Sequence, residues 1–520
     1  MIMKLKNIIN TLTLAAVALV ATGCQDTDAQ VSIADTDAPA YVGVSPETSS
    51  AMLFGTTTIK VNFDKNIGFA TKNAIQVTLN GKPVKKAWVA GISKSLSIIA
   101  DVDFSRTQVL HIPAGLVTGP QGKTFDEELN LTWTIDDLPD NAAGTVTKTL
   151  GWGWNLGNHF DTSKEAIDNN WGYWDQTDIL TDAPFVTLSG VGAKTMRIPV
   201  TWDAHMDEAG IIKADFFNEV AAVVDKAIAH GMNVILNTHH DAFETDLGNA
   251  VATEDDYKKD SAQIVSTWGQ IAKRFASYGD QLIFETFNEV HAGDNWNAGT
   301  AEENALLNKW NQWAVNAIRA AGGNNTTRWI AVSGYAANID QTIASLVLPD
   351  DSANRIIVAV HSYDPYSFCL APVDADGNEA YNSWGHNADP DHSVSDFNEE
   401  AVIKQLYKLR TAYIDQGIPC YLGEYGCVVH PSDRGNAFRK YYLEFFCRAA
   451  FQAGIPMFVW DNTSDNETAT GNEANCYMSH KTGNFVADGA EVIPMMIKAC
   501  TSGDYSYWFD TIWTHSPAAE

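Results

Sequence analysis

The sequence predicts an α/β chain whose larger part is a (β/α)8 TIM barrel, preceded by a small all-β domain. From about residue 148, short apolar runs alternate with longer amphipathic segments through most of the remaining chain. Between about residues 41 and 137, apolar and polar residues alternate singly, as in strands with one buried face. The 520 residues exceed what one ordinary core accommodates, so we expect separate domains.

Positive charge precedes an apolar run at the N-terminus. Lys4 and Lys6 come first, the run extends over residues 8–21, and Ala21-Thr22-Gly23-Cys24 follows. This pattern resembles a bacterial lipoprotein signal, and the run is too short and interrupted to span a membrane as a stable helix. A plain secretion signal is the alternative.

The lipoprotein reading divides the first 40 residues into two parts. Residues 1–23 would be the signal peptide, Cys24 the lipidated first residue, and residues 24–40 a polar tether. We therefore expect an exported protein that is anchored by lipid to a membrane, at the outer membrane or the cell surface.

Residues 41–137 are expected to form a β-sandwich. An Asn80-Gly81 pair predicts a tight hairpin turn. The region resembles the bacterial Ig-like domains that act as spacers in surface proteins, from Val44-Ser45-Pro46 to Phe63-Asp64-Lys65. A carbohydrate-binding role is the alternative, and residues 138–147 are expected to be a linker. The alternating apolar residues of three runs are Ile59, Val61 and Phe63; Ile75, Val77 and Leu79; and Leu129, Leu131, Trp133 and Ile135.

The barrel is expected to occupy residues 148–520. Between its strands, amphipathic helical faces begin near Phe216, Ile264, Leu306 and Phe438. The eight expected strands lie near residues 150–156, 194–199, 232–238, 281–288, 328–333, 355–361, 418–423 and 455–460.

Polar residues follow the expected strands, where a barrel carries its functional side chains. Asn288-Glu289 ends the fourth strand, and Glu424 lies at the end of the seventh. An Asn-Glu pair alone is better explained as a cap for the next helix. Two carboxylates at the ends of two buried strands are the arrangement that glycoside hydrolysis needs. The other polar strand ends are Gly153–Asn158, Arg197–Trp202, Asn237–Asp241, His361–Pro365 and Phe458–Asn462.

With these motifs the sequence resembles glycoside hydrolase family 5, the cellulase family A, from about Gly151 to Trp460. The resemblance implies a TIM barrel and a retaining enzyme that needs no cofactor or metal. The roles that it implies are acid/base for Glu289, nucleophile for Glu424, a bond to the sugar 2-hydroxyl for Asn288, support of the nucleophile for Arg197 and Tyr363, and further substrate contacts for Asn158, His239, His240, His361 and Trp460.

The charges agree with these roles. Arg197 near Glu424 would favour the ionised form that a nucleophile needs, while Glu289 must hold a proton to donate. Of the paired histidines, His239 is the better match to the family role. Glu285 lies earlier in its strand, and we expect it to be a structural carboxylate inside the barrel.

The motifs look most like the endo-β-1,4-glucanase branch of the family, which includes xyloglucanases. Trp171-Gly172 belongs to this pattern, whereas Glu289-Val290-His291 departs from it because a proline commonly follows the glutamate. After the sixth strand, a long loop offers aromatic platforms for the leaving-group side of the substrate, unless it packs on itself. Its aromatic residues are Tyr366, Phe368, Tyr381 and Trp384.

Other functions stay open at this point. A mannan- or β-1,3-glucan-cleaving enzyme has the same motifs, and a glycan-binding protein with an inactive barrel is a different class. The presence of both Glu289 and Glu424 argues against the inactive barrel.

Composition bounds the partners. The formal net charge of −30 offers no basic stripe for nucleic acid. It suits a soluble extracellular protein that acts on a neutral polymer, and solubility alone would explain it equally well. We expect a monomer whose substrate is a β-glucan polysaccharide or oligosaccharide. Besides Cys24, six cysteines permit disulfides, and their spacing does not predict a zinc site. These cysteines are Cys369, Cys420, Cys427, Cys447, Cys476 and Cys500.

Overall fold

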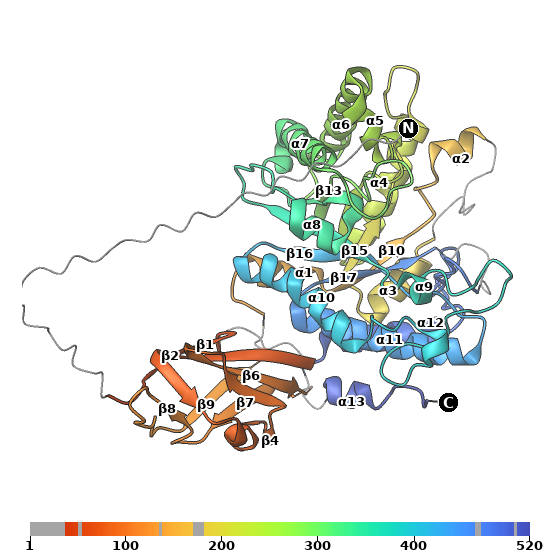
Figure 1. Ribbon diagram of the computed structural model, residues 1–520. Helices are drawn as coiled ribbons and strands as arrows, with labels where there is room; N and C mark the ends of the chain where they lie inside the picture. Colours follow the sequence, from red (N-terminus) through yellow and green to blue (C-terminus); the bar gives the residue numbers. More distant parts are fainter. Residues whose placement is uncertain are drawn as a thin grey trace, which may run out of the picture.

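The computed structural model places an all-β unit and a barrel unit along the chain (Figure 1). Cys24, the signal peptide and Trp171-Gly172 lie outside the residues that the structure describes. No helix within the described ranges has both the length and the apolar character needed to cross a bilayer. The described ranges are residues 37–49, 55–103, 105–134, 138–169, 181–462, 470–503 and 507–519.

The N-terminal unit contains two antiparallel sheets that share one core. One sheet has the order β1-β2-β6-β5, with β8 paired to β2, and the other has the order β4-β3-β7-β9. Apolar side chains from both sheets, such as Ile59 and Leu131, meet in a single buried cluster, so the sandwich prediction is confirmed. The strands are β1 (Tyr41–Ser45), β2 (Gly55–Phe69), β3 (Thr78–Leu79), β4 (Lys82–Pro83), β5 (Lys86–Val89), β6 (Ser93–Val102), β7 (Thr107–Ile112), β8 (Val117–Thr118) and β9 (Leu129–Thr134).

One strand of this unit is shorter than its alternation predicts. Residues Thr71–Gln76 form a 3-10 helix, η1, and Ile75 is 72% exposed. Val77 and Leu79 are buried as expected. Asn80 and Gly81 both have positive φ angles, 49° and 75°, and join β3 to β4 in the predicted hairpin.

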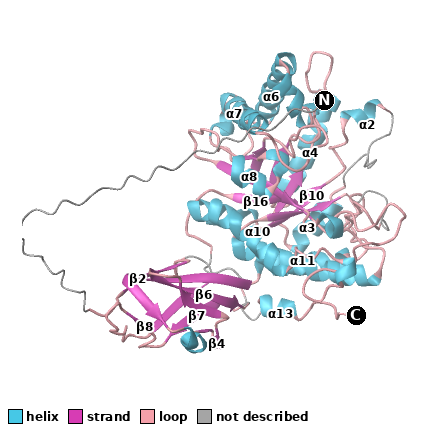
Figure 2. Ribbon diagram, in the orientation of Figure 1, coloured by secondary structure: helices cyan, strands magenta, loops and turns pink. Residues whose placement is uncertain are grey.

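The second unit is a closed barrel of eight parallel strands, β10 to β17 in chain order. Each expected strand is present within a few residues of its predicted place, so the barrel prediction is confirmed. Figure 2 shows the strands surrounded by helices. The strands are β10 (Trp152–Leu156), β11 (Thr195–Ile198), β12 (Asn233–Asn237), β13 (Leu282–Glu285), β14 (Ile330–Val332), β15 (Ile356–Ser362), β16 (Cys420–Tyr425) and β17 (Met457–Asp461).

The helices bury one apolar face against these strands. In α7, Thr300 and Glu303 form a capping box, while Leu306, Trp310 and Ile318 are buried. The α-helices that follow β10 are α2 (Lys164–Asp168), α3 (Ala183–Val191), α4 (Ala214–Ala229), α5 (Leu247–Ala252), α6 (Glu254–Arg274), α7 (Ala301–Ala320), α8 (Ile339–Ser345), α9 (Tyr366–Cys369), α10 (Glu399–Ala412), α11 (Asp433–Ala453), α12 (Gly489–Thr501) and α13 (Phe509–Trp513). The 3-10 helices of this unit are η2 (Asp203–His205), η3 (Ala242–Glu244), η4 (Gly323–Thr326), η5 (Tyr335–Ala337), η6 (Pro390–His392) and η7 (Ile414–Gln416).

The expected linker contains a helix that belongs to the barrel. Helix α1 (Ala142–Leu150) is capped by Asn141, whose side chain accepts from the backbone N–H of Gly144. Val146 and Leu150 of this helix join a buried cluster of strand residues that includes Ile235 and Phe458. The helix therefore closes the end of the barrel where the strands begin. Its four apolar residues in nine are too few to show, by pattern alone, whether the segment closes a barrel or is a linker.

The six cysteines beyond Cys24 are buried thiols, and no disulfide joins them in the described part of the chain. They therefore do not supply the cross-links that their even number permits.

We predict that replacing Leu150 with alanine lowers the free energy of unfolding by about 2–5 kcal/mol. The side chain is 1% exposed, and its truncation leaves a cavity between α1 and the barrel strands. Urea denaturation of the barrel measures this loss. Lys148→Ala is the matched control, since Lys148 lies on the exposed face of the same helix. Equal effects of the two changes would show that α1 does not stabilise the barrel.

Candidate active site

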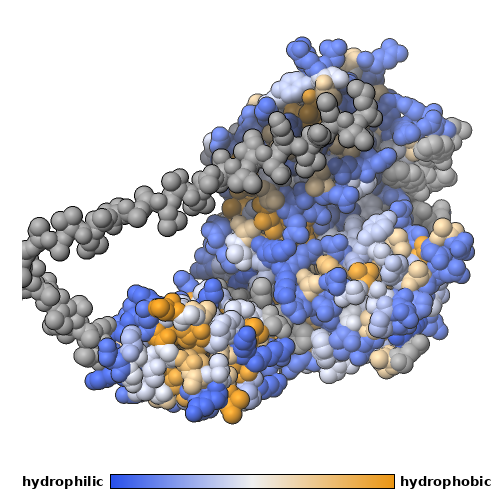
Figure 3. Space-filling view, viewed as in Figure 1, coloured by the Kyte–Doolittle hydropathy of each residue, from blue (hydrophilic) through white to orange (hydrophobic). Residues whose placement is uncertain are grey.

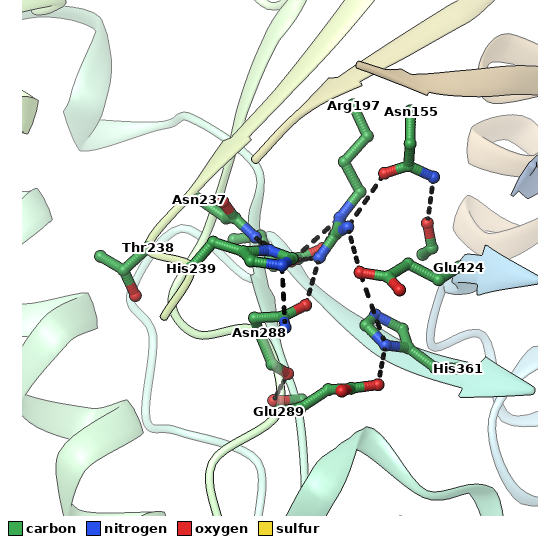
Figure 4. A network of polar contacts seen from close by, with 12 residues as sticks. Asn155, Arg197, Asn237, Thr238, His239, Asn288, Glu289, His361 and Glu424 are labelled. Carbon is green, nitrogen blue, oxygen red and sulfur yellow. Dashed lines mark hydrogen bonds and ion pairs between the residues drawn. The ribbon is translucent and has the colours of Figure 1, made fainter. Parts of the chain in front are cut away.

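The predicted site residues meet at the end of the barrel where the strands terminate. Arg197 comes from β11, His361 from β15 and Glu424 from β16. Asn288 and Glu289 follow β13, three and four residues after its last residue. In Figure 4 these side chains point toward one another, although up to 227 residues separate them in the sequence.

Arg197 is the centre of this network and is fully buried. Its Nη1 donates to Glu424 Oε1 at 2.8 Å and to Asn155 Oδ1 at 2.9 Å. Its Nη2 donates to Glu285 Oε1 at 2.6 Å and to Asn288 Oδ1 at 2.8 Å. Burial lowers the pKa of Arg197, but the carboxylates of Glu285 and Glu424 outweigh burial and raise it above its ordinary value. The guanidinium thus stays charged and orients both carboxylates.

Glu285 is the structural carboxylate that the sequence led us to expect. Its Oε2 accepts from the Tyr421 hydroxyl at 2.6 Å, and its Oε1 accepts from Asn237 Nδ2 at 3.0 Å. Burial acts to raise the pKa of Glu285, but Arg197 lowers it by more, so the pKa lies below its ordinary value. Glu285 is therefore a buried anion that balances the guanidinium.

Glu289 and Glu424 face each other across His361. The imidazole Nδ1 lies 2.6 Å from Glu289 Oε1 and 3.9 Å from Glu424 Oε1. One oxygen of each glutamate and one nitrogen of His361 all lie within 4.8 Å of one another. Burial lowers the pKa of His361, but the Glu424 and Glu289 carboxylates outweigh it and raise the pKa above its ordinary value.

Tyr363 supports Glu424 from the other side. Its hydroxyl donates to Glu424 Oε2 at 2.9 Å, while Arg197 binds Oε1. Burial and the neighbouring carboxylates raise the pKa of Tyr363 well above its ordinary value, so the hydroxyl keeps the proton that it donates. Both oxygens of Glu424 are thereby held in place by a hydrogen-bond donor.

His239 and Trp460 form one wall of the site. Their rings are stacked, with centroids 5.7 Å apart and planes 10° from parallel. His239 Nε2 lies 3.3 Å from Asn288 Nδ2. Burial and then the charges of His240 and Arg197 lower the pKa of His239 well below its ordinary value, so the ring is neutral near pH 7.

The remaining expected residues sit at the edge of this wall. His240 has a positive φ of 59°, its ring centroid is 4.3 Å from that of His239, and burial lowers its pKa to about 4. Asn158 also has a positive φ, 62°, and its backbone N–H donates to Asp161 Oδ2 at 3.1 Å. Burial raises the pKa of Asp161 to about 8. Asn158 is thus placed by a strained turn that Asp161 holds.

The expectation that Trp384 binds substrate is wrong. The side chain is 1% exposed and packs against Tyr441, Tyr442 and Phe445. Trp384 is therefore part of the packing beside α11. A pattern of aromatic residues in a loop does not distinguish a sugar platform from a loop that packs on itself, which was the open alternative.

Glu244 is a residue that the sequence reasoning missed. It lies in η3, is 2% exposed, and accepts from the backbone N–H groups of His240 at 3.0 Å and Asn288 at 3.1 Å. It therefore joins the ends of β12 and β13 just before the expected acid/base, Glu289. Its signal in the sequence is weak, since a glutamate five residues after His239 also fits an exposed turn.

Two groups in the described part of the chain could offer three metal ligands within 4.8 Å. One is Glu289, His361 and Glu424, where a cation would occupy both carboxylates. The other is Asp161, His239 and His240. Both groups use residues that are already hydrogen-bonded within the site, and neither brings in a cysteine.

The fold and the site together define a glycoside hydrolase built on a TIM barrel. Residues 157–466 match the model of cellulase, glycosyl hydrolase family 5. The chain therefore belongs to this family.

Relatives and solved structures agree with this assignment. Endoglucanase A of Clostridium longisporum is 32% identical over 337 residues, which are 62% of this chain and 59% of that relative. The chain therefore spans little more than half of the length of that endoglucanase.

Two solved structures are similar. A Bacteroidetes-affiliated GH5 cellulase linked with a polysaccharide utilization locus has a TM-score of 0.65 and 35% identity, and the match covers 73% of this chain and 99% of that one. A GH5-4 broad specificity endoglucanase from Bacteroides salanitronis has a TM-score of 0.64 and 39% identity, over 70% of this chain and 97% of that one.

We predict that Glu244→Gln makes stability less dependent on pH. Burial, more than the nearby Glu289, raises the pKa of Glu244 to about 8 from its ordinary 4.5, so the folded chain keeps a proton that the unfolded chain has released. The free energy of unfolding of the wild type should therefore fall between about pH 5 and 8, relative to the variant, by about 1.4 kcal/mol per pH unit.

Urea denaturation of both proteins at several pH values measures the difference. Parallel pH profiles would show that Glu244 is ionised in the folded chain. Glu244→Ala serves as a second variant, because it removes the acceptor of both backbone N–H groups and should also lower the rate of catalysis.

Proposed function

We propose that the chain is an endo-acting, retaining hydrolase of β-1,4-glucan chains, of the cellulose, xyloglucan or mixed-linkage type. The observation that carries this proposal is the approach of one Glu289 oxygen to one Glu424 oxygen within 4.8 Å. Retaining glycosidases hold their two carboxyl groups about 5–5.5 Å apart, whereas inverting enzymes leave about 6.5–9.5 Å for a water molecule. The similar proteins are an endoglucanase, a cellulase and a broad specificity endoglucanase.

In the first step, Glu289 donates its proton to the glycosidic oxygen as the bond to the anomeric carbon breaks. A Glu424 oxygen attacks that carbon and forms an ester bond, while Arg197 and Tyr363 hold the carboxylate in position. Asn288 is held by Arg197 and offers its amide N–H to the sugar 2-hydroxyl.

In the second step, water enters in place of the released chain. Glu289, now ionised, accepts a proton from this water as its oxygen attacks the anomeric carbon. The ester bond to Glu424 breaks and the carboxylate is restored. Two inversions leave the product with the configuration of the substrate.

A reducing-sugar assay tests the substrate class. Carboxymethylcellulose, xyloglucan and mixed-linkage glucan should be cleaved faster than mannan or β-1,3-glucan, with a rapid fall in viscosity that marks internal cleavage. Faster cleavage of mannan would overturn the glucan assignment. If no reducing sugar is released from any of these polymers, the remaining alternative is a glycan-binding protein with an inactive barrel.

We also propose export and lipid anchoring through Cys24. Support comes from the sequence alone, since the structure describes the chain only from residue 37. An exported position suits a polymer that is too large to enter a cell. The Ig-like resemblance of the N-terminal sandwich, and its use as a spacer, remain part of the same proposal.

We predict that Glu289→Ala loses about 10²–10⁴-fold in the rate on glucan, since general acid catalysis contributes about that much. The loss should be far smaller in the first step on an aryl glycoside, whose leaving group needs little protonation. Pre-steady-state release of the phenol measures that step. Equal losses on both substrates would contradict the acid/base role.

We predict that Glu424 forms the covalent bond. A 2-deoxy-2-fluoro glycoside slows breakdown of the intermediate, so the label should accumulate on the peptide that contains Glu424. Peptide mapping by mass spectrometry identifies the labelled residue, and Glu424→Gln is the control that should remain unlabelled. Label on Glu289 would reverse the two roles, and a product of inverted configuration would overturn the retaining mechanism.

A further inference from the structure

Asn237 is the last residue of β12, and its side chain is fully buried beside His239 (Figure 4). Its Oδ1 accepts from the backbone N–H of Val200 at 3.2 Å, and its Nδ2 donates to Glu285 Oε1 at 3.0 Å. A backbone N–H can only donate, and an ionised carboxylate can only accept. These two contacts therefore fix which end of the Asn237 amide carries the hydrogens.

The same amide nitrogen lies 3.3 Å from Nδ1 of His239. It carries two hydrogens and accepts none, and Glu285 binds one of the two. The second hydrogen is left for the imidazole. Nδ1 is therefore the acceptor of this contact, because a hydrogen on Nδ1 would be buried against another donor.

The other ring nitrogen of His239, Nε2, has different surroundings. It lies 3.3 Å from Asn288 Nδ2 and 3.9 Å from Asp161 Oδ2. Asn288 Oδ1 accepts from Arg197, so Asn288 Nδ2 is a donor too. A second hydrogen on the ring is disfavoured because both ring nitrogens face an amide donor, and the lowered pKa of His239, which results first from burial, agrees with this. The single hydrogen of the ring belongs on Nε2, where an oxygen acceptor is near.

We propose that Asn237 is a positioning residue that fixes His239 in the tautomer with its hydrogen on Nε2, so that His239 and Asn288 present two neighbouring donors to one sugar hydroxyl group. The consequence for the substrate rests on the proposed function. Two N–H donors that face each other at 3.3 Å repel, and an oxygen atom that accepts from both relieves the repulsion. The arrangement is therefore complementary to a hydroxyl group that accepts.

Nitrogen-15 NMR of the full chain labelled in its histidines tests the tautomer, because protonated and unprotonated ring nitrogens resonate in separate regions of the spectrum. The chain has 13 histidines, and the His239→Gln variant identifies the signals of His239 by their loss. Near pH 7 the wild type should carry a hydrogen on Nε2 and none on Nδ1. A hydrogen on Nδ1 of the wild type would overturn the proposal, whatever the variants do.

Asn237→Asp tests the cause of the tautomer. The change puts an accepting oxygen in place of the amide nitrogen, so it should place a hydrogen on Nδ1 of His239. Asn311→Asp is the matched control, since Asn311 is another fully buried asparagine and contacts Thr286 and Ser333 instead. It should keep the wild-type tautomer. An unchanged tautomer in folded Asn237→Asp would show that Asn237 does not set it.

Kinetics on cellotetraose test the role in the reaction. Asn237→Asp should lower kcat/KM by about five- to tenfold, because one donor to the substrate is lost. The same change should have little effect in the His239→Gln background, since Asn237 is proposed to act through the imidazole. Equal losses in both backgrounds would overturn this role. An inactive wild type that shows the expected tautomer would instead contradict the proposed function.

Discussion

A guanidinium buried at the mouth of the barrel is costly to desolvate, and Arg197 recovers this cost only through the acceptors around it. The acceptors come from β10 (Asn155), β16 (Glu424) and the end of β13 (Glu285 and Asn288). The position of each acceptor is therefore fixed by its hydrogen bond to the buried guanidinium. The orientation of Glu424 and Asn288 follows from this electrostatic requirement, and the barrel provides the rigid strands that make it possible.

The two glutamates acquire different properties from their surroundings. The Glu424 side chain is 7% exposed and is bound at both oxygens, whereas the Glu289 side chain is 21% exposed and lines a cavity of about 550 Å³. Glu424 is therefore fixed in one orientation, whereas the Glu289 carboxyl is open to solvent. Figure 3 shows that hydrophilic residues cover most of the visible face of the barrel unit, as expected for a chain of net charge −30.

The sequence predicts the barrel and most of the site because both depend on local patterns. Apolar runs define the strands, and parallel strands place polar residues such as Arg197 and Glu424 at one end. Trp384 is buried and Ile75 is exposed, contrary to the predictions, because the exposure of each depends on distant parts of the chain. For Trp384 these are residues of α11, and for Ile75 the rest of the sandwich. Helix α1 packs against strand residues far along the chain, and Glu244 accepts a hydrogen bond from the backbone of Asn288. No local sequence pattern predicts such long-range contacts.

The side chains around the two glutamates differ in charge. Arg197 is balanced by Glu285, and His239 is neutral near pH 7 because burial and the neighbouring charges of His240 and Arg197 lower its pKa. The raised pKa of His361 results from the carboxylates of Glu424 and Glu289, which outweigh its burial. Its Nδ1 lies 2.6 Å from Glu289 Oε1, within hydrogen-bond distance. The same network therefore holds both glutamates, since His361 lies against Glu289 while Arg197 and Tyr363 bind the two oxygens of Glu424.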